Sequence, residues 1–388
     1  MSTYIDVSVL MITTFVTGIQ RVTREVSLKL IEREPSEIRL LQYSVGDESF
    51  HIIDNDRFYN YFEYGKGSKH RIVSKDTVDI HNVRGGDIWF DLDASWMGKV
   101  KRSWLLPILK NQGCRIIGHI YDIISVTHPQ YCMEQGVYYF ADYIGAHLLY
   151  DSEMIVNAEA TLNELERLAK KAAVSLPKCN VVYLGANFDK TDEIDISQVS
   201  PSIATRIRHR KYILMVGTLE PRKNHKLVLD AYDGRCFDGG TKSLREQGYD
   251  IIMAGYLGWN MKNFYDRLIN HPDYNKRIFH FEGLGDIDIS YLYKNCEYLV
   301  FSSYTEGFGL PIIEAINKGA RVVCADVPVL REIGGNKCLW FKQDDAQDLA
   351  SVIEKDVASG KPIITEKVDI NAFSWNNTTE EILKILRR

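Results

Sequence analysis

The segment "CEYLVFSSYTEGFGLPIIEAINKGA" (residues 296–320) has the pattern of a strand, a glycine-rich turn and a helix. Residues 296–303 are apolar and rich in β-branched and aromatic side chains, which is typical of a buried strand. Pro311 suits the first position of a helix, and Gly319 suits its end. Such a turn presents backbone N–H groups at the positive end of the helix dipole, so the segment predicts an anion site.

Strand-like and helix-like runs alternate along the rest of the chain, which predicts doubly wound parallel sheets. In the first half we expect strands at residues 4–11, 37–45, 87–93, 114–124, 141–152 and 178–186, and helices at residues 19–33, 100–113 and 159–173. In the second half we expect strands at residues 212–219, 249–256, 277–284, 298–303 and 321–326, and helices at residues 224–235, 263–271, 289–296, 312–320 and 345–356. Ligands of such sheets bind at the carboxyl ends of the strands.

Length and composition narrow the class of protein. A chain of 388 residues with 45% hydrophobic and 26% charged residues has enough apolar material for two soluble domains. Its net charge of −5 argues against a nucleic-acid partner. None of its seven cysteines forms a C-x-x-C pair, so we expect reduced thiols rather than zinc. The first 20 residues lack a signal-peptide layout, and we expect a cytoplasmic protein.

A second motif, "VGTLEPRKNH" (216–225), places two cations where a predicted strand ends. Gly217 permits a turn, and Arg222 and Lys223 stand just before a predicted helix. Two cations there can neutralise a diphosphate without a metal. The alternative is a solvated basic loop. The anion-ready turn at 307–311, on another strand of the same sheet, favours the diphosphate interpretation.

These two segments resemble the signature segments of the retaining GT-B glycosyltransferases of family 4, in which two glutamates form an E-x7-E nucleotide-sugar motif. Weaker resemblances extend over essentially the whole chain and include "TGIQRVTREV" with Gly18, which is similar to the family's N-terminal glycine loop. The resemblance implies the GT-B fold, with two Rossmann-like, doubly wound α/β domains facing across a cleft. We expect an acceptor-side domain over 1–189, a linker over 190–208, a nucleotide-sugar domain over 209–372 and a helix over 373–388 that crosses back to the first domain.

The resemblance also implies roles for individual residues. Arg222 and Lys223 would stabilise the leaving nucleoside diphosphate, helped by the amides of Gly309 and Leu310, and Gly217 belongs to the same donor site. Stabilising the charge of the leaving group usually makes a large contribution to the rate of such a transfer reaction.

The remaining donor contacts implied by the resemblance involve the glutamates and the turn between them. Glu314 would hold the ribose hydroxyls and Glu306 would lie near the donor sugar. The amides of Gly307, Phe308 and Gly309 would fix the hydroxyls of that sugar, and close backbone approach requires glycine there.

The chain departs from the family pattern at two places. Thr218 stands where many relatives have an arginine, which leaves Arg222 and Lys223 to meet the diphosphate. Tyr121 stands where many have a histidine, directly before Asp122, which we take as a catalytic candidate. His119 lies two residues earlier, and we interpret it as structural.

The run "FDLDASW" (90–96) supports a rival interpretation, because a D-x-D motif binds a divalent metal in the other large transferase fold. Alternation would point Asp91 and Asp93 the same way at a strand end, which suits a loop cap or an acceptor hydroxyl equally well. The motif also lies away from both phosphate loops. We therefore expect no metal and no cofactor beyond the nucleotide-sugar donor.

The basic, tryptophan-containing segment 97–115 has two interpretations. It would dock on the inner membrane face or on a lipid-linked acceptor, or it is an ordinary charged helix, which is the commoner case.

The leading hypothesis is a metal-independent retaining hexosyltransferase. By resemblance the donor is GDP-mannose and the acceptor a surface polysaccharide or lipid-linked oligosaccharide. The alternatives are a UDP- or dTDP-sugar donor, a nucleotide-sugar epimerase of the same fold, and a non-catalytic sugar-nucleotide binding subunit.

Overall fold

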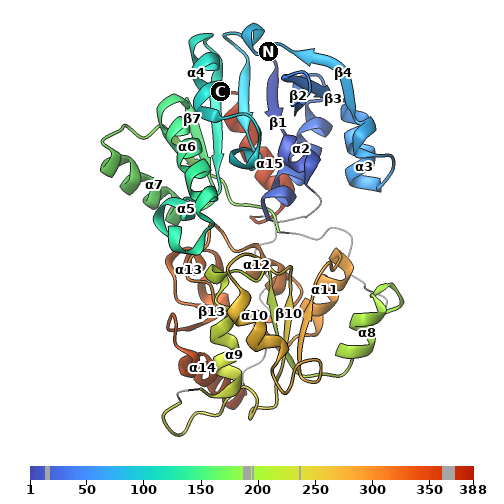
Figure 1. Cartoon of the computed structure of the whole chain (residues 1–388), viewed down its shortest axis with the longest axis vertical. Coiled ribbons are helices and arrows are strands. Elements are labelled where there is room, and N and C mark those ends of the chain that lie inside the picture. The colour runs from blue at the N-terminus through green and yellow to red at the C-terminus, as the bar shows by residue number, and fades with distance from the viewer. Residues whose placement is uncertain (14–17, 187–193, 195, 236, 361–371) are drawn as a thin grey trace. The chain divides into compact units, whose positions relative to one another are not determined.

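The computed structural model describes residues 1–13, 18–186, 194, 196–235, 237–360 and 372–388. Its contacts divide the chain into unit 1, which comprises Met1–Gly185 with Asn371–Arg388, and unit 2, which comprises Ala186–Ile370. In each unit helices cover a central sheet (Figure 1). Within the described part of the chain, no helix is both long enough and apolar enough to cross a membrane.

The sheet of unit 1 has the strand order β4-β3-β2-β1-β5-β6-β7-β8. Its strands are β1 (Thr3–Asp6), β2 (Ile38–Ser44), β3 (Ser49–Ile53), β4 (Val73–Val78), β5 (Ile88–Asp91), β6 (Arg115–Ile120), β7 (Glu153–Val156) and β8 (Lys178–Val181). From β2 to β8 all neighbours are parallel, as the alternation of elements predicts, and β3 and β4 are antiparallel additions at one edge.

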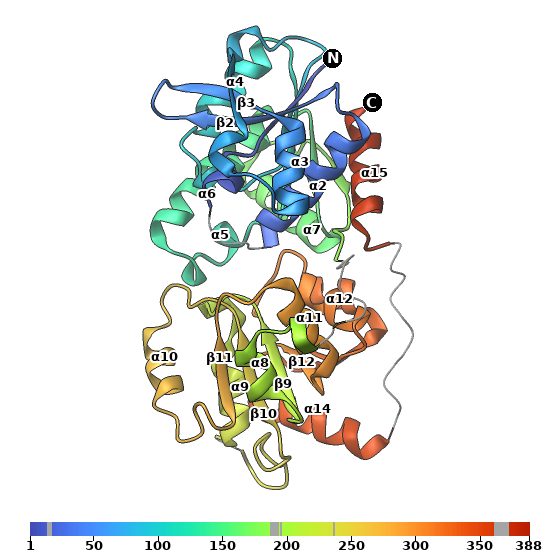
Figure 2. The ribbon, with the colours of Figure 1, turned by 90° about the vertical axis from the view of Figure 1, so that its right-hand side faces the viewer.

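The helices of unit 1 are α1 (Ser8–Ile12), α2 (Gly18–Arg33), α3 (Asn55–Tyr64), α4 (Arg102–Asn111), α5 (Ile124–Thr127), α6 (Glu134–Tyr150), α7 (Glu159–Ala172) and α15 (Trp375–Leu386). The C-terminal helix α15 lies along α2 in both ribbon views (Figures 1 and 2). Trp375 is buried, and a Cβ on Gly185 would approach its backbone nitrogen to 2.4 Å. Thr378 donates a 2.7 Å hydrogen bond to the carbonyl of Tyr183. These contacts make α15 part of unit 1.

The sheet of unit 2 is parallel throughout its described strands, in the order β11-β10-β9-β12-β13-β14. Its strands are β9 (Tyr212–Val216), β10 (Asp250–Ala254), β11 (Ile278–Phe281), β12 (Tyr298–Phe301), β13 (Arg321–Ala325) and β14 (Cys338–Phe341). Counted within the unit this is the Rossmann order 3-2-1-4-5-6, whose strand order reverses between β9 and β12. Ligands of such sheets bind at that point, beyond the carboxyl ends of the strands.

The helices of unit 2 are α8 (Pro201–Ile207), α9 (His225–Asp233), α10 (Lys262–Ile269), α11 (Asp286–Asn295), α12 (Leu310–Asn317), α13 (Pro328–Gly334) and α14 (Ala346–Ser359). The apolar face of α9 packs on β9 and β10, with Val228 and Tyr232 fully buried against Ile213 and Ile251. Asn224 fixes the start of α9, because its side chain accepts a hydrogen bond from the N–H of Leu227.

The structure corrects the strand predicted at residues 141–152, which lie mostly within helix α6. Tyr143, Ile144, His147 and Leu148 are buried at spacings of three and four, which is a helical repeat. Because the segment is apolar on nearly every face, it is easily taken for a buried strand. The strand predicted over 4–11 is also too long, since β1 ends at Asp6 and α1 follows.

The expected linker at 190–208 is wrong in its second half. Pro201 begins helix α8, and Ile203 and Ile207 are buried in unit 2. Proline at the first helical turn and apolar residues four apart carry the helix signal that the polar composition obscures. Residues 190–193 and 195 lie outside the described residues.

Candidate active site

Two loops of unit 2 leave the sheet side by side at the point where its strand order reverses. The strands β9 and β12 are hydrogen-bonded neighbours, with Ile213 opposite Tyr298 and Leu214 opposite Leu299. The loop after β9 contains Arg222 and Lys223 in a short 3-10 helix, Pro221–Lys223, and the loop after β12 contains Glu306. The topology therefore brings the two predicted motifs together.

Glu306 is held between the two cations. Its Oε1 lies 2.6 Å from Nζ of Lys223 and its Oε2 lies 2.5 Å from Nη1 of Arg222. Ser303 donates a further hydrogen bond of 2.7 Å to Oε1. The Glu306 side chain is only 7% exposed. Burial opposes its charge, but Arg222 and Lys223 outweigh burial and lower the pKa of Glu306 to about 2.

A second carboxylate, which the sequence analysis missed, also contacts Arg222. Oε1 of Glu220 lies 2.5 Å from Nη2 of Arg222, and Glu220 is 5% exposed. In this arrangement Glu306 and Glu220 balance the charges of Arg222 and Lys223. The motif "EPRK" contains the signal, because a carboxylate two residues before an arginine in a tight turn is well placed to pair with it.

Hydrogen bonds to the main chain join the two loops. The N–H of Tyr304 donates to the carbonyl of Arg222 at 2.9 Å, and Nη1 of Arg222 donates to the carbonyl of Thr305 at 2.9 Å. Ser302 donates its hydroxyl to the carbonyls of Lys223 and Asn224. These contacts fix the Arg222–Lys223 turn against the start of the Glu306 loop.

A third loop, which follows β14, completes the arrangement and was also missed. Asp344 accepts hydrogen bonds from the amide of Asn224 at 3.2 Å and from the hydroxyl of Tyr304 at 2.7 Å. Gln343 donates to the carbonyl of Tyr304 at 2.8 Å. Asp344 thus contacts the residue after Lys223 and a residue two positions before Glu306. Its distance in sequence from both motifs hides this role.

Two glycines are required by local geometry. Gly217 has φ 132°, and the side chain of Lys223 lies over it with Cε 3.5 Å from where a Cβ would be. Gly309 has φ 103° and precedes the first residue of α12, so it gives the turn a conformation that L side chains rarely adopt.

The rest of the glycine-rich turn leads into α12. Gly307 and Phe308 are buried and Leu310 is half-buried. Glu314 lies one turn into the helix, is 4% exposed and accepts a 2.9 Å hydrogen bond from the hydroxyl of Tyr293 on α11. The structure thus gives Glu314 a fixed orientation, through a partner that the motif does not contain.

The two remaining candidates, Asp122 and Gly18, lie in unit 1. Asp122 is half-buried after β6 and accepts a 2.9 Å hydrogen bond from the N–H of Ile124. Gly18 is exposed at the first residue of α2, and the preceding Thr17 lies outside the described residues. His119 is buried, and its Nε2 contacts the amide oxygen of Asn157 at 2.7 Å. Burial lowers the pKa of His119 to about 4, so the ring is neutral.

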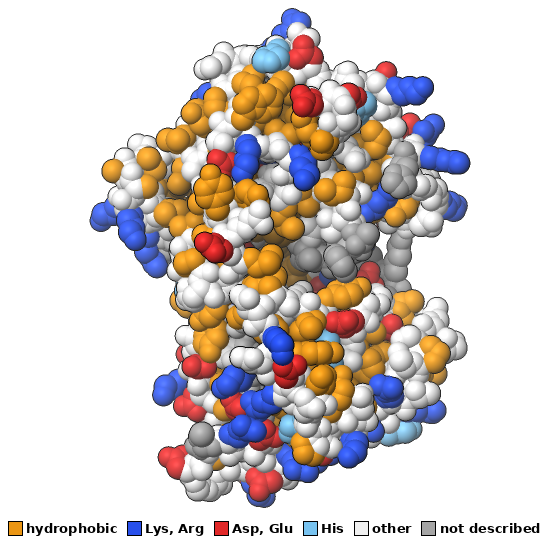
Figure 3. Space-filling view, in the orientation of Figure 1, with side chains coloured by type: hydrophobic (Ala, Val, Ile, Leu, Met, Phe, Trp, Pro, Cys, Tyr) orange, Lys and Arg blue, Asp and Glu red, His pale blue; other side chains and the backbone are white. Residues whose placement is uncertain are grey.

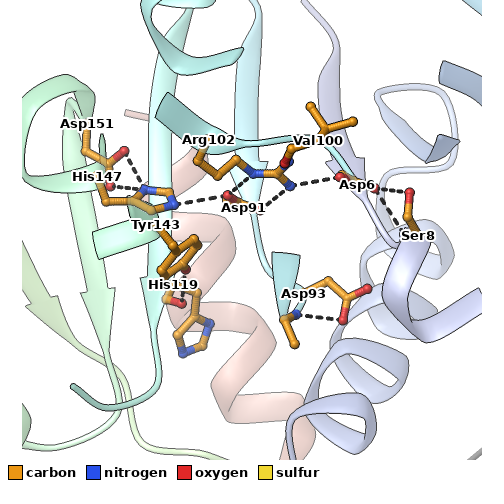
Figure 4. A network of polar contacts seen from close by, with 11 residues as sticks. Asp6, Ser8, Asp91, Asp93, Val100, Arg102, His119, Tyr143, His147 and Asp151 are labelled. Atoms are coloured by element: carbon orange, nitrogen blue, oxygen red, sulfur yellow. Dashed lines mark hydrogen bonds and ion pairs between the residues drawn. The ribbon is translucent and has the colours of Figure 1, made fainter. Parts of the chain in front are cut away.

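The two aspartates of the D-x-D run have separate partners (Figure 4). Asp91 makes a bidentate pair with the buried guanidinium of Arg102 and contacts Nε2 of His147 at 3.0 Å. Asp93 instead accepts hydrogen bonds from the N–H groups of Leu10 and Ala94. Among the described residues, no three His, Cys, Asp or Glu side chains are grouped to hold a metal ion.

The Asp91 pairs belong to a longer buried network in unit 1. Arg102 also contacts Asp6 at the end of β1, and His147 contacts Asp151, so that anions and cations alternate across the sheet (Figure 4). Burial opposes a charge on His147, but Asp151 and Asp91 outweigh burial and raise the pKa of His147 to about 9. The network therefore braces the strand ends of β1 and β5.

The comparisons with known proteins match the part of the chain that contains this site. Residues 202–369 match the family model described as "Glycosyl transferases group 1". The chain is 26% identical over 394 residues to "Serotype-specific mannosyltransferase WbdA" of Escherichia coli, covering 98% of this chain and 46% of that protein. It is 31% identical over 176 residues to "O-antigen chain mannosyltransferase B" of Escherichia coli, covering 44% of each. The chain thus spans about half the length of these curated relatives.

Among solved structures, this protein is similar to Anabaena Alr3699/HepE in complex with UDP, with a TM-score of 0.62 at 15% identity, and each chain is fully covered. That similarity concerns the fold, which is the GT-B fold that the sequence analysis predicts. The matched family segment contains β9, β12 and both loops of the ion-pair cluster. The family match therefore covers the segment of the chain, residues 202–369, that holds the candidate site.

Proposed function

We propose that this chain is a retaining, metal-independent mannosyltransferase that moves mannose from GDP-mannose to a saccharide acceptor in surface-polysaccharide or lipid-linked glycan synthesis. One observation carries the proposal: Arg222 and Lys223 meet Glu306 where the strand order of unit 2 reverses. The relatives named as mannosyltransferases support the choice of sugar.

In this proposal the diphosphate of the donor lies against Arg222 and Lys223. Both cations already contact carboxylates, so the diphosphate exchanges for Glu306 as their partner. Lys223 then faces the charge that grows as the bond between the sugar C1 and the diphosphate oxygen breaks, where a fixed cation stabilises the transition state. Released from Lys223, Glu306 is placed to accept hydrogen bonds from hydroxyls of the donor sugar.

Glu314 holds the ribose hydroxyls, with its carboxylate oriented by Tyr293. The acceptor oxygen attacks C1 from the face that the diphosphate leaves, and its proton passes to a phosphate oxygen of the leaving group. One C–O bond forms as another breaks on the same face, so the anomeric configuration is retained. No step uses a metal ion.

A donor screen followed by a transfer assay tests this function. Thermal shifts with GDP-, UDP- and dTDP-sugars identify the donor, because a ligand that binds the folded state stabilises it. The chosen donor is then incubated with mannose-terminated oligosaccharides, and the product is examined by mass spectrometry and by NMR of the new anomeric centre. We expect a mannosylated product with retained configuration, formed equally in EDTA.

Other results would change the assignment. Activity that is lost in EDTA and restored by manganese would contradict the metal-independent mechanism. An epimerised sugar nucleotide without transfer would indicate an epimerase. Stabilisation by a donor without turnover on any acceptor would indicate a binding subunit.

A further inference from the structure

Residues 45–84 of unit 1 form an addition to the parallel sheet that the proposed transferase chemistry does not use. The chain makes β3, α3 and β4 there, with β3 antiparallel to β2 and β4 antiparallel to β3. Between α3 and the start of β4 lies a hollow of about 680 Å³. Gly67 and Ser68 form part of its wall.

Every charged side chain that lines this hollow is a cation, namely Arg57, Lys66, Arg71 and Lys75. In the described part of the chain, the side chains of Arg71 and Lys75 make no hydrogen bond or ion pair. The ammonium of Lys66 lies 5.4 Å from the ring centre of Tyr64. The protein as a whole carries a net charge of −5, so its overall charge does not account for this cluster.

The cluster is held in place by the fold of the addition. Nη1 of Arg57 on α3 donates a 2.8 Å hydrogen bond to the carbonyl of Arg71, which ties the helix to the chain just before β4. Asp54, the N-cap of α3, lies 3.7 Å from Nε of Arg57 and offsets part of one charge. Figure 3 shows lysine and arginine side chains gathered along the edge of unit 1 where α3 and β4 lie in Figure 1.

We propose that this hollow is a second anion site, which binds a phosphate ester separately from the donor site of unit 2. Two guanidinium and two ammonium groups around one concavity offer charge-assisted hydrogen bonds to phosphate oxygens. A concave surface that is lined by charges of one sign also concentrates the electric field and therefore attracts such an anion. The phosphate is carried either by a soluble phosphate ester or by the headgroup of an anionic lipid.

Lysine acetylation of the full chain, read by peptide mass spectrometry, tests the site residue by residue. Inorganic pyrophosphate is the soluble probe, and Lys171 and Lys178, exposed lysines of unit 1 away from the hollow, are internal references. We expect pyrophosphate to slow the acetylation of Lys66 and Lys75 and to leave both references unchanged. The protection should weaken at high salt.

The variant Arg71→Ala should raise the pyrophosphate concentration needed for protection about tenfold, because it removes one contact to a charged group. Arg71 is exposed, so the variant should fold, and the Lys171→Ala variant removes one charge elsewhere in the unit as a matched control. Because both lysines lie in unit 1, this result is independent of any binding at Lys223.

A vesicle arm distinguishes the two sources of phosphate. Vesicles of phosphatidylglycerol with phosphatidylcholine, but not of phosphatidylcholine alone, should protect Lys66 and Lys75 and sediment the protein if the ligand is a lipid headgroup. Protection by pyrophosphate without vesicle binding would indicate a soluble phosphate ester. Equal acetylation of Lys66, Lys75 and the reference lysines with every probe, or protection unchanged by Arg71→Ala, would overturn the proposal.

Discussion

Nζ of Lys223 and Oε1 of Glu306 are 2.6 Å apart, although the two residues are 83 positions apart in the chain. The contact exists because β9 and β12 are neighbours in the sheet and each sends its loop to the same edge. It means that the cation expected to meet the donor diphosphate already has an anionic partner. A diphosphate must therefore compete with Glu306 for Lys223.

The change Glu306→Gln should strengthen the binding of a nucleoside diphosphate, because it removes a competing anion and keeps the shape of the side chain. We expect a rise in affinity of roughly tenfold, equivalent to about 1.4 kcal/mol, measured by calorimetry. Turnover should fall, since Glu306 is proposed to contact the donor sugar. The exposed Glu297→Gln is the matched control. Weaker diphosphate binding by Glu306→Gln would show that the two anions do not compete.

The change Lys223→Ala should lower turnover by about 100-fold or more, the usual loss of a group that stabilises developing charge. Steady-state rates at saturating donor measure this effect, and Lys110→Ala, an exposed lysine of unit 1, should be neutral. The double variant with Arg222→Ala should lose less than the product of the two separate losses, because both cations contact Glu306. Full turnover in Lys223→Ala would remove Lys223 from the mechanism.

The change Glu314→Ala should raise the KM for the donor about tenfold and leave turnover nearly unchanged. A ribose contact is made equally in the ground state and the transition state, so its loss affects binding alone. Tyr293→Phe, which removes the hydroxyl donated to Glu314, should raise KM by a smaller factor. A fall in turnover with an unaltered KM would instead place Glu314 near the reacting bond.

The buried network of unit 1 should make its stability depend on pH. The pKa of His147 is raised to about 9 in the folded protein, whereas a free histidine has a pKa of about 6.5. The protonated ring therefore contributes its full stabilisation of unit 1 below pH 6.5, and this stabilisation is lost as pH rises through 9. Between these pH values we expect the free energy of unfolding of unit 1 to fall by up to about 3 kcal/mol. Hydrogen exchange of peptides spanning α6, corrected for intrinsic exchange rates, measures this change. His147→Gln should flatten the profile between pH 6.5 and 9, and an unchanged profile would rule out this role.

Much of the fold is predictable from the sequence because its signals are local. The alternation of apolar strands and amphipathic helices predicts the sheet of unit 2, and the turn before Pro311 predicts the start of α12. The segment that contains Tyr143 and His147 misleads because both a buried strand and a buried helix can be apolar on every face.

The candidate site is predictable only in part. Arg222, Lys223 and Glu306 are recognisable from their motifs, and the order of β9 and β12 in the sheet is what joins them. Glu220 and Asp344 are not recognisable, because their roles depend on contacts between loops that no spacing encodes. The ion pair between Asp91 and Arg102 cannot be recognised from the sequence for the same reason. Without that pair, the D-x-D run could be interpreted as a metal site, an interpretation that the observed contacts of Asp91 do not support.

A calorimetric titration tests the central claim most directly. The claim is that Arg222 and Lys223 form the diphosphate subsite of a nucleotide-sugar site. The best-binding nucleoside diphosphate among GDP, UDP and dTDP is titrated against its own monophosphate, at low and high salt, into the unaltered chain and into Lys223→Ala. We predict tighter binding of the diphosphate, a preference that shrinks at high salt and that Lys223→Ala largely abolishes. Equal affinities for the two nucleotides, insensitive to salt and to Lys223→Ala, would contradict the account.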